Sequence, residues 1–211
     1  MCAHGPVTAS VCRPWWPSDG RPGRRVPLQY GRGAPALPVG GRCGPGAATG
    51  RGRTLVPVHL CFVCTGNICR SPSAALVFAE HLRRAGLDGT VRVSSAGIGP
   101  WHVGEPIDER AGAVLTRGGY PVEHIAAQVG AEHGDADLFL AMDVGHEKAL
   151  RRLVDDPSTV RLLRSFDPDA HGDLDVPDPY YGDPEGFDEV LAMIEASVPG
   201  LLAWVRERLA V

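Results

Sequence analysis

Hydrophobic residues gather in four short runs after residue 57, and each run is followed by a segment with helical spacing. The runs are Val58–Cys64, Val91–Ser95, Leu138–Met142 and Val160–Leu163. The first and third are almost continuously apolar, which is typical of strands buried on both faces of a parallel sheet. Strands that alternate with helices predict an α/β fold, here a four-stranded parallel sheet flanked by helices on both faces.

The segments between the runs carry helix signals. Ser71-Pro72-Ser73 opens a helix that we expect to continue over Ala74–Leu87, with Pro72 in the first turn. Further helices are expected over Asp108–Thr116, Val144–Leu153 and Phe187–Leu209, the last bent near Pro199. Residues 165–186 are rich in Asp, Pro and Gly and form a predicted loop too long to be a mere connector.

Residues 1–56 lack this pattern and differ in composition. They hold 11 Gly and 8 Pro and show no apolar periodicity. Eight Arg against one Asp give them a net charge of +7, so residues 57–211 carry −11. Such a segment cannot bury enough apolar surface to offset its ordering entropy. We predict a disordered extension over residues 1–56 and one domain over residues 57–211.

Two interpretations of the basic extension stay open. It could contact nucleic acid or a membrane surface. It could instead be inert, or not translated. The chain has 20 Arg and one Lys, which indicates GC-rich coding DNA, and any reading frame of such DNA encodes Gly, Ala, Pro and Arg. We favour the second interpretation, and the acidic charge of residues 57–211 makes nucleic acid a poor partner for the domain.

The chain shows no membrane or secretion signal and an uneven use of cysteine. No stretch approaches roughly 18 consecutive apolar residues, and the N-terminus lacks the apolar core of a signal peptide. Three of the six cysteines lie in residues 1–56, and the others, Cys61, Cys64 and Cys69, crowd into nine residues. Because no cysteine follows Cys69, disulfides cannot cross-link the far parts of the domain. We expect a reduced, cytoplasmic protein.

The turn between the first strand and the first helix reads Cys64-Thr65-Gly66-Asn67-Ile68-Cys69-Arg70-Ser71, a C-x5-R-S pattern. Backbone N–H groups and a helix N-terminus make such a turn an anion cradle. Its donors would stabilise Cys64 as a thiolate nucleophile, and Arg70 would grip two phosphate oxygens. Gly66 and Asn67 tolerate the positive φ that such a cradle needs. Ser71 can donate to the thiolate, and no Walker Gly-Lys-Ser/Thr occurs.

The residues FVCTGNICRSP at positions 62–72 resemble the signature loop of the low-molecular-weight protein tyrosine phosphatases. Further matches follow in the family's order at Ser94–Gly97, Trp101–Gly104, His124, Met142-Asp143 and Asp178–Gly182. The resemblance spans about residues 57–210 and is especially close to actinobacterial members. It implies a phosphate-binding loop after the first strand, formed by Thr65, Gly66, Asn67, Ile68, Cys69 and Ser71. It also implies hydrolysis of phosphotyrosine in a protein substrate, without metal or cofactor; we expect a monomer.

A phosphomonoester needs its leaving oxygen protonated, and the resemblance selects Asp178 for this role among six Asp in residues 165–186. Pro177 and Pro179 stiffen the acid, and neighbouring tyrosines can exclude water. The same carboxylate would then activate the water that hydrolyses a phosphocysteine. A calcium loop is an alternative, with ligands at Asp167, Asp169, His171, Asp173, Asp175 and Asp178, but His at the fifth position and Asp at the twelfth fit it poorly.

The resemblance also assigns supporting residues. It places Ser71, Ser95 and His124 in a network that holds Asn67. Asp143 follows a strand end and could anchor the loop or cap a helix. Candidates for the walls of an aromatic slot are Trp101, Tyr180 and Tyr181. The Cys64 and Cys69 pair, a family feature, implies a reversible disulfide that protects Cys64, whereas Cys61 is expected to be inert in the core.

Three other functions compete with phosphotyrosine hydrolysis. Arsenate reductases also begin with C-x5-R but need two further cysteines downstream, and none follows Cys69. An anion-binding module without turnover would leave the intact set of Cys64, Arg70 and Asp178 unexplained. Some relatives prefer phosphoarginine, a preference associated with Thr at the position of Ile68. Ile68 and the paired tyrosines therefore favour an aryl phosphate.

Overall fold

The computed structural model describes residues 57–209, so the extension predicted over residues 1–56 lies outside the described residues. The strands are β1 (Val58–Cys64), β2 (Val91–Gly97), β3 (Leu138–Ala141) and β4 (Val160–Leu162). The α-helices are α1 (Arg70–Arg84), α2 (Glu109–Arg117), α3 (Val144–Leu150) and α4 (Glu185–Leu209). Short 3-10 helices lie in the connections at η1 (Ala131–His133), η2 (Pro157–Thr159) and η3 (Leu163–Phe166).

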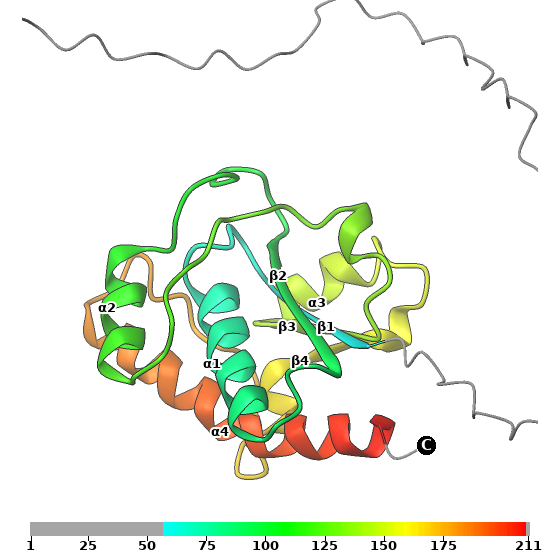
Figure 1. The fold of residues 1–211 in the computed structure, drawn as a ribbon. Coiled ribbons are helices and arrows are strands. Elements are labelled where there is room, and N and C mark those ends of the chain that lie inside the picture. The colour runs from blue at the N-terminus through cyan, green and yellow to red at the C-terminus, as the bar shows by residue number, and fades with distance from the viewer. Residues whose placement is uncertain (1–56, 210–211) are drawn as a thin grey trace, which may run out of the picture. The chain divides into compact units, whose positions relative to one another are not determined.

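The four strands form one parallel sheet in the order β2-β1-β3-β4, which confirms the predicted fold (Figure 1). β1 lies inside the sheet, where it pairs with β2 over its whole length and with β3 from Leu60 to Val63. The chain passes from β1 to β2 on one side and then crosses to β3 on the other. The sheet therefore has its topological switch point at the carboxyl ends of β1 and β3, where ligands bind in such folds.

Alternate residues of β1 face two different layers, because successive side chains of a strand point to opposite faces. Leu60 and Phe62 pack with side chains of α1 and α4. Cys61 and Val63 pack with residues of β3 and with Leu150 of α3. All four strand residues are fully buried. Figure 1 shows α1 and α4 on one side of the sheet and α3 on the other, as predicted.

Several element ends differ from the prediction. α1 ends at Arg84 rather than Leu87, and the left-handed Gly86 follows it with a φ of 69°. α3 ends at Leu150 rather than Leu153. The long loop is shorter than expected because η3 occupies its start and α4 begins at Glu185. α4 continues as one helix through Pro199, and Gly200 lets it approach η3 closely, since a Cβ there would lie 2.1 Å from the Phe166 carbonyl oxygen.

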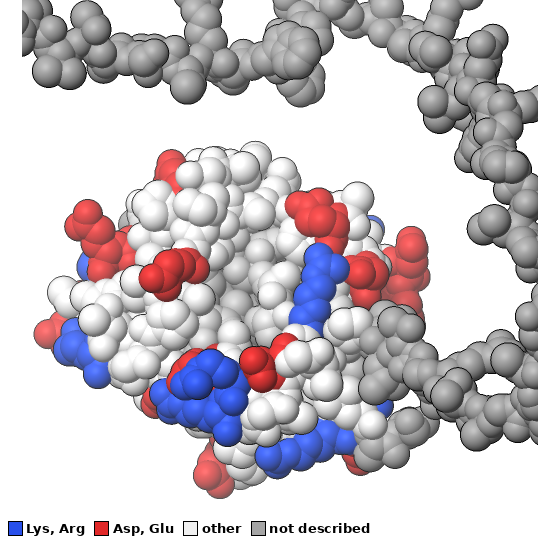
Figure 2. Space-filling view, in the orientation of Figure 1, with Lys and Arg blue, Asp and Glu red and all other residues white. Residues whose placement is uncertain are grey.

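Charged side chains on the face shown in Figure 2 lie in small separate groups. Lys and Arg form no continuous stripe on this face of the described residues, and Asp and Glu are spread among them. A nucleic-acid surface needs clustered cations that can neutralise several phosphates. This face therefore gives no support to the nucleic-acid alternative.

Candidate active site

Cys64 is the last residue of β1, and its sulfur lies at the base of the turn that leads into α1. The backbone N–H of Asn67 donates to Cys64 Sγ over 3.3 Å, and Ser71 Oγ lies 3.0 Å from the same sulfur. Both groups can donate to a thiolate, as the C-x5-R-S pattern predicts. Cys64 is nearly buried, so its sulfur meets these donors with little competition from water.

Asn67 adopts the left-handed conformation expected of it, with a φ of 59°. Its Nδ2 donates to Ser71 Oγ (2.8 Å) and Ser95 Oγ (2.9 Å), and its Oδ1 accepts from the backbone N–H of Ala127 (2.9 Å). His124 Nε2 lies 2.8 Å from the Asn67 carbonyl oxygen. Burial lowers the pKa of His124 more than this hydrogen bond raises it. The serines and His124 thus hold Asn67 as the resemblance implies.

Of the two residues that tolerate a positive φ in the turn, Asn67 alone adopts one. Gly66 is required for space instead. A Cβ at this position would lie 2.7 Å from His102 Cδ2, closer than side chains tolerate. His102 is in turn held by Glu105, whose Oε2 lies 2.7 Å from its Nδ1. The loop therefore packs its glycine against a histidine that sequence reasoning left without a role.

Arg70, the first residue of α1, is almost fully buried, and its guanidinium has four partners. Nη1 donates to Asp143 Oδ2 (3.1 Å) and to the Val176 carbonyl oxygen (3.1 Å). Nη2 donates to Thr65 Oγ1 (3.2 Å) and to Asp178 Oδ2 (2.6 Å). Arg70 and Asp178 are therefore ion-paired at the site, although they lie 108 positions apart in the chain.

Asp143 fills both of the roles weighed for it. It caps α3, because its Oδ1 accepts from the backbone N–H of His146 (2.8 Å), and it anchors Arg70 through Oδ2. Burial alone would raise the pKa of Asp143, but its contacts with the backbone N–H and ring of His146 and the Arg70 charge outweigh burial and bring it to about 2. Asp143 is thus a permanent anion beside the guanidinium.

The segment that carries Asp178 is held over the turn by its own hydrogen bonds and by α2. The backbone N–H of Tyr180 donates to Asp178 Oδ1 (3.1 Å). Arg110 of α2 donates to the Tyr180 carbonyl oxygen (3.1 Å) and lies 5.4 Å from the centre of the Tyr180 ring. Tyr181 packs edge-on against Tyr180, with ring centres 4.9 Å apart, and is 92 % exposed. Sequence reasoning missed Arg110, whose only signal is its place in a helix near the motif.

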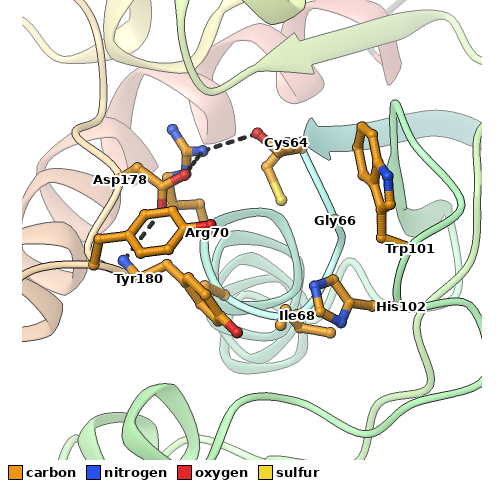
Figure 3. A pocket seen from close by; sticks show the side chains of 11 residues that line it. Cys64, Gly66, Ile68, Arg70, Trp101, His102, Asp178 and Tyr180 are labelled. Carbon is orange, nitrogen blue, oxygen red and sulfur yellow. Dashed lines mark hydrogen bonds and ion pairs between the residues drawn. The ribbon is translucent and has the colours of Figure 1, made fainter.

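These groups surround a cavity of about 340 Å³ at the switch point of the sheet. It is lined by Cys64, Thr65, Gly66, Ile68, Cys69, Arg70, Trp101, His102, Asp178, Tyr180 and Tyr181. Figure 3 shows the Cys64 sulfur pointing into the cavity, with Trp101 and Tyr180 on opposite sides of its mouth. The structure thus brings together the predicted nucleophile, phosphate clamp, acid and aromatic walls. Five predicted residues do not line the cavity: Asn67, Ser71, Ser95, His124 and Asp143.

The three cysteines among the described residues are free thiols. Burial raises the pKa of Cys69 to about 12, and burial raises the pKa of Cys61 to about 12 as well. Both are thiols at neutral pH, which leaves Cys64 as the candidate nucleophile. The disulfide implied between Cys64 and Cys69 stays a prediction.

Residues 57–209 contain no group of three or more His, Cys, Asp or Glu side chains arranged to hold a metal ion. The carboxylates of the calcium-like spacing cap backbone instead: Asp173 Oδ1 accepts from the N–H of Asp175, and Asp175 Oδ1 accepts from the N–H of Val144. The calcium alternative is therefore wrong for this part of the chain. Over the same residues, no helix is long and apolar enough to cross a bilayer.

Comparisons with known proteins point to one family. Its model, the low molecular weight phosphotyrosine protein phosphatase, matches residues 59–211. The Low molecular weight protein-tyrosine phosphatase A of Mycobacterium tuberculosis is 58% identical over 156 residues, 73% of this chain and 95% of that protein. The low molecular weight protein-tyrosine-phosphatase of Streptomyces coelicolor is 54% identical, covering 71% of this chain and 94% of that protein.

A solved structure agrees with these sequence matches. YfkJ from Bacillus subtilis superposes with a TM-score of 0.68 at 35% identity, over 74% of this chain and 99% of that chain. The two actinobacterial relatives also confirm the subgroup that the motifs indicated. With a C-x5-R turn at the switch point of a parallel sheet, the chain belongs to the low molecular weight phosphotyrosine protein phosphatase family.

Proposed function

We propose that the protein hydrolyses phosphotyrosine in phosphoproteins through a phosphocysteine intermediate. Family membership supports phosphotyrosine hydrolysis as the reaction. The observation that carries the residue roles is the cavity that Cys64, Arg70 and Asp178 line together, from the two ends of the turn and from a distant segment. We assign Cys64 as nucleophile, Arg70 as phosphate clamp and Asp178 as general acid and base.

In the first step Cys64 Sγ attacks the phosphorus as the bond to the tyrosine oxygen breaks. Asp178 gives its proton to that departing oxygen, which leaves as a neutral phenol. Arg70 and the backbone N–H groups of the turn stabilise the charge on the three remaining oxygens. The product of this step is a phosphocysteine and a carboxylate at Asp178.

In the second step the Asp178 carboxylate takes a proton from water, which attacks the phosphocysteine. The phosphorus–sulfur bond breaks, and Cys64 departs as a thiolate. Ser71 Oγ, 3.0 Å from the sulfur, and the Asn67 N–H stabilise this leaving group. Inorganic phosphate and the original protonation state of Asp178 result, so the cycle closes without a metal ion.

The ion pair between Arg70 and Asp178 would compete with a bound substrate for the same guanidinium. Asp178 Oδ2 lies 2.6 Å from Arg70 Nη2, one of the donors that a phosphate would use. A bound dianion competes for this donor and repels the carboxylate, so substrate binding favours separation of Asp178 from Arg70. Substrate would thereby release the side chain that its own leaving group needs.

Aromatic side chains at the mouth favour an aryl phosphate. Trp101 is 67 % exposed, a large apolar surface left open beside the cavity. Tyr180 stands across from it, and Ile68 forms part of the floor (Figure 3). A phenyl ring between two aromatic faces gains packing that an alkyl chain does not. This arrangement supports phosphotyrosine over the phosphoarginine alternative.

The test compares Cys64→Ser with Cys61→Ser, the same atom change three residues earlier on β1. Cys61 faces the opposite layer of the sheet and serves as the matched control. We expect Cys64→Ser to lose turnover of an aryl phosphate while still binding inorganic phosphate, because the N–H donors and Arg70 remain. Cys61→Ser should retain turnover. Full activity in Cys64→Ser would refute the proposed nucleophile, and phosphate binding without turnover in the unmodified protein would indicate a binding module instead.

A further inference from the structure

Two residues of the turn after β1, Thr65 and Arg70, form a closed ring of polar contacts with Asp143 and His146. Arg70 donates to Thr65 Oγ1 (3.2 Å) through Nη2 and to Asp143 Oδ2 (3.1 Å) through Nη1. His146 closes the ring, with Nε2 at 2.9 Å from Thr65 Oγ1 and Nδ1 at 2.9 Å from Asp143 Oδ1. The ring joins the first residue of the turn, Thr65, to Arg70 at its end, and both to the N-terminus of α3.

The Thr65 hydroxyl links Arg70 to His146 in this ring. Thr65 Oγ1 accepts from Arg70, and it can donate to or accept from His146 Nε2, because a hydroxyl holds one proton and two lone pairs. On the other side of the ring, a proton on His146 Nδ1 faces the Asp143 carboxylate, whose Oδ1 lies 2.9 Å away. The buried Nδ1 completes no hydrogen bond within residues 57–209. The opposite tautomer would place a nitrogen lone pair against a carboxylate oxygen.

The surroundings of His146 suit a fixed support rather than contact with substrate. Its side chain is buried and does not line the cavity. Its backbone N–H also holds Asp143 Oδ1, so the carboxylate is fixed by the same residue twice. A guanidinium matches two phosphate oxygens only in a narrow range of orientations. Groups that fix the orientation of Arg70 therefore govern how well it binds an oxyanion.

We propose that His146 is a positioning residue, which orients the Arg70 guanidinium toward phosphate through Thr65 and Asp143. This inference rests on the proposed function of the Cys64 loop. Because His146 touches no reacting atom, its removal should weaken binding of phosphate-like anions and lower kcat/KM. Sequence reasoning missed this histidine, whose only signal is its spacing of three residues from Asp143.

Three substitutions separate the two contacts of His146. His146→Gln keeps an acceptor near the position of Nε2 for Thr65, whereas His146→Asn keeps a donor near Nδ1 for Asp143. His146→Ala keeps neither. In His146→Ala we expect vanadate affinity and kcat/KM for an aryl phosphate to fall about tenfold, the scale of one hydrogen bond to a charged group. His146→Gln should recover most of the loss, because it restores the contact to Thr65.

Thr65→Val tests whether the effect passes through the ring. It removes the hydroxyl and keeps the shape of the side chain. If His146 acts through Thr65, the losses in vanadate affinity from Thr65→Val and His146→Ala should be less than additive in the double variant. Fully additive losses would overturn the proposal.

His133→Ala is the matched control, because His133 is a buried histidine of η1 whose Nδ1 accepts from the Gly130 N–H over 3.2 Å. It lies outside the cavity lining. If the role of His146 is merely structural, His146→Ala should lower Tm as His133→Ala does and leave the vanadate affinity of the folded protein unchanged. That result would refute the inference. Absence of turnover and vanadate binding in the unmodified protein would defeat the proposed function itself.

Discussion

Replacing Asn67 with alanine should remove the main internal support of the phosphate loop. The amide makes three side-chain hydrogen bonds, to Ser71, Ser95 and the backbone of Ala127, and the residue is fully buried. Each bond contributes about 1 kcal/mol net, and an alanine held at a φ of 59° adds about 1 kcal/mol of strain. We therefore expect Asn67→Ala to lower the free energy of unfolding by about 4 kcal/mol.

Ser95→Ala provides a graded comparison, since it removes one of the three bonds and leaves the backbone of the loop alone. Its expected cost is about 1 kcal/mol. For a domain of this size, 1 kcal/mol shifts Tm by about 3 °C, so the two variants should differ by roughly 10 °C. Urea unfolding followed by circular dichroism measures both free energies on one scale.

Asn67→Ala and Ser95→Ala should also differ in their affinity for vanadate. Without the Asn67 amide, the left-handed backbone at this position loses its side-chain support, and the N–H of residue 67 that faces Cys64 loses its fixed direction, so vanadate affinity should fall in Asn67→Ala. Ser95→Ala leaves two of the three hydrogen bonds and should bind vanadate nearly as well as the unmodified protein. If Asn67→Ala costs no more stability than Ser95→Ala, the hydrogen bonds of Asn67 do not hold the loop, and the reasoning fails.

Three further outcomes are expected. Asp178→Ala should slow hydrolysis of phenyl phosphate about 10²- to 10⁴-fold and hydrolysis of a nitrophenyl ester much less. Inorganic phosphate should bind no more weakly, because Arg70 Nη2 loses its competitor. Equal losses for both esters would exclude Asp178 as the acid. Burial lowers the pKa of His59, so as pH falls below about 6.5 the unfolded chain binds a proton at this residue before the folded protein does, and the free energy of unfolding should decrease. In His59→Gln this decrease should be smaller, as measured by urea unfolding at about pH 7.5 and about pH 5.5. Deletion of residues 1–55, which precede the family match, should leave kcat/KM of the enzyme within about twofold in a steady-state assay.

Local sequence determined the sheet and the chemistry of the turn. The apolar run Val58–Cys64 specifies a buried strand because a parallel strand inside a sheet has no solvent-facing side chains. The C-x5-R-S pattern then places thiol, backbone donors and guanidinium within eight residues, so their approach follows from the turn itself. The sequence likewise indicated Asn67 as a residue that can adopt the left-handed conformation, because few residue types do so.

Tertiary structure decided which distant residues meet at the site. Arg70 contacts Asp178 and Asp143, and Thr65 contacts His146, across chain separations that no periodicity encodes. The contacts of Asp143 and His146 depend on strand order, because β1 and β3 are neighbours and the segment after β3 therefore lies beside the turn after β1. The sequence does not distinguish His146, the third residue of α3, from other helical histidines. Only the fold brings its ring to Thr65, because a hydrogen bond depends on distance in space and not along the chain.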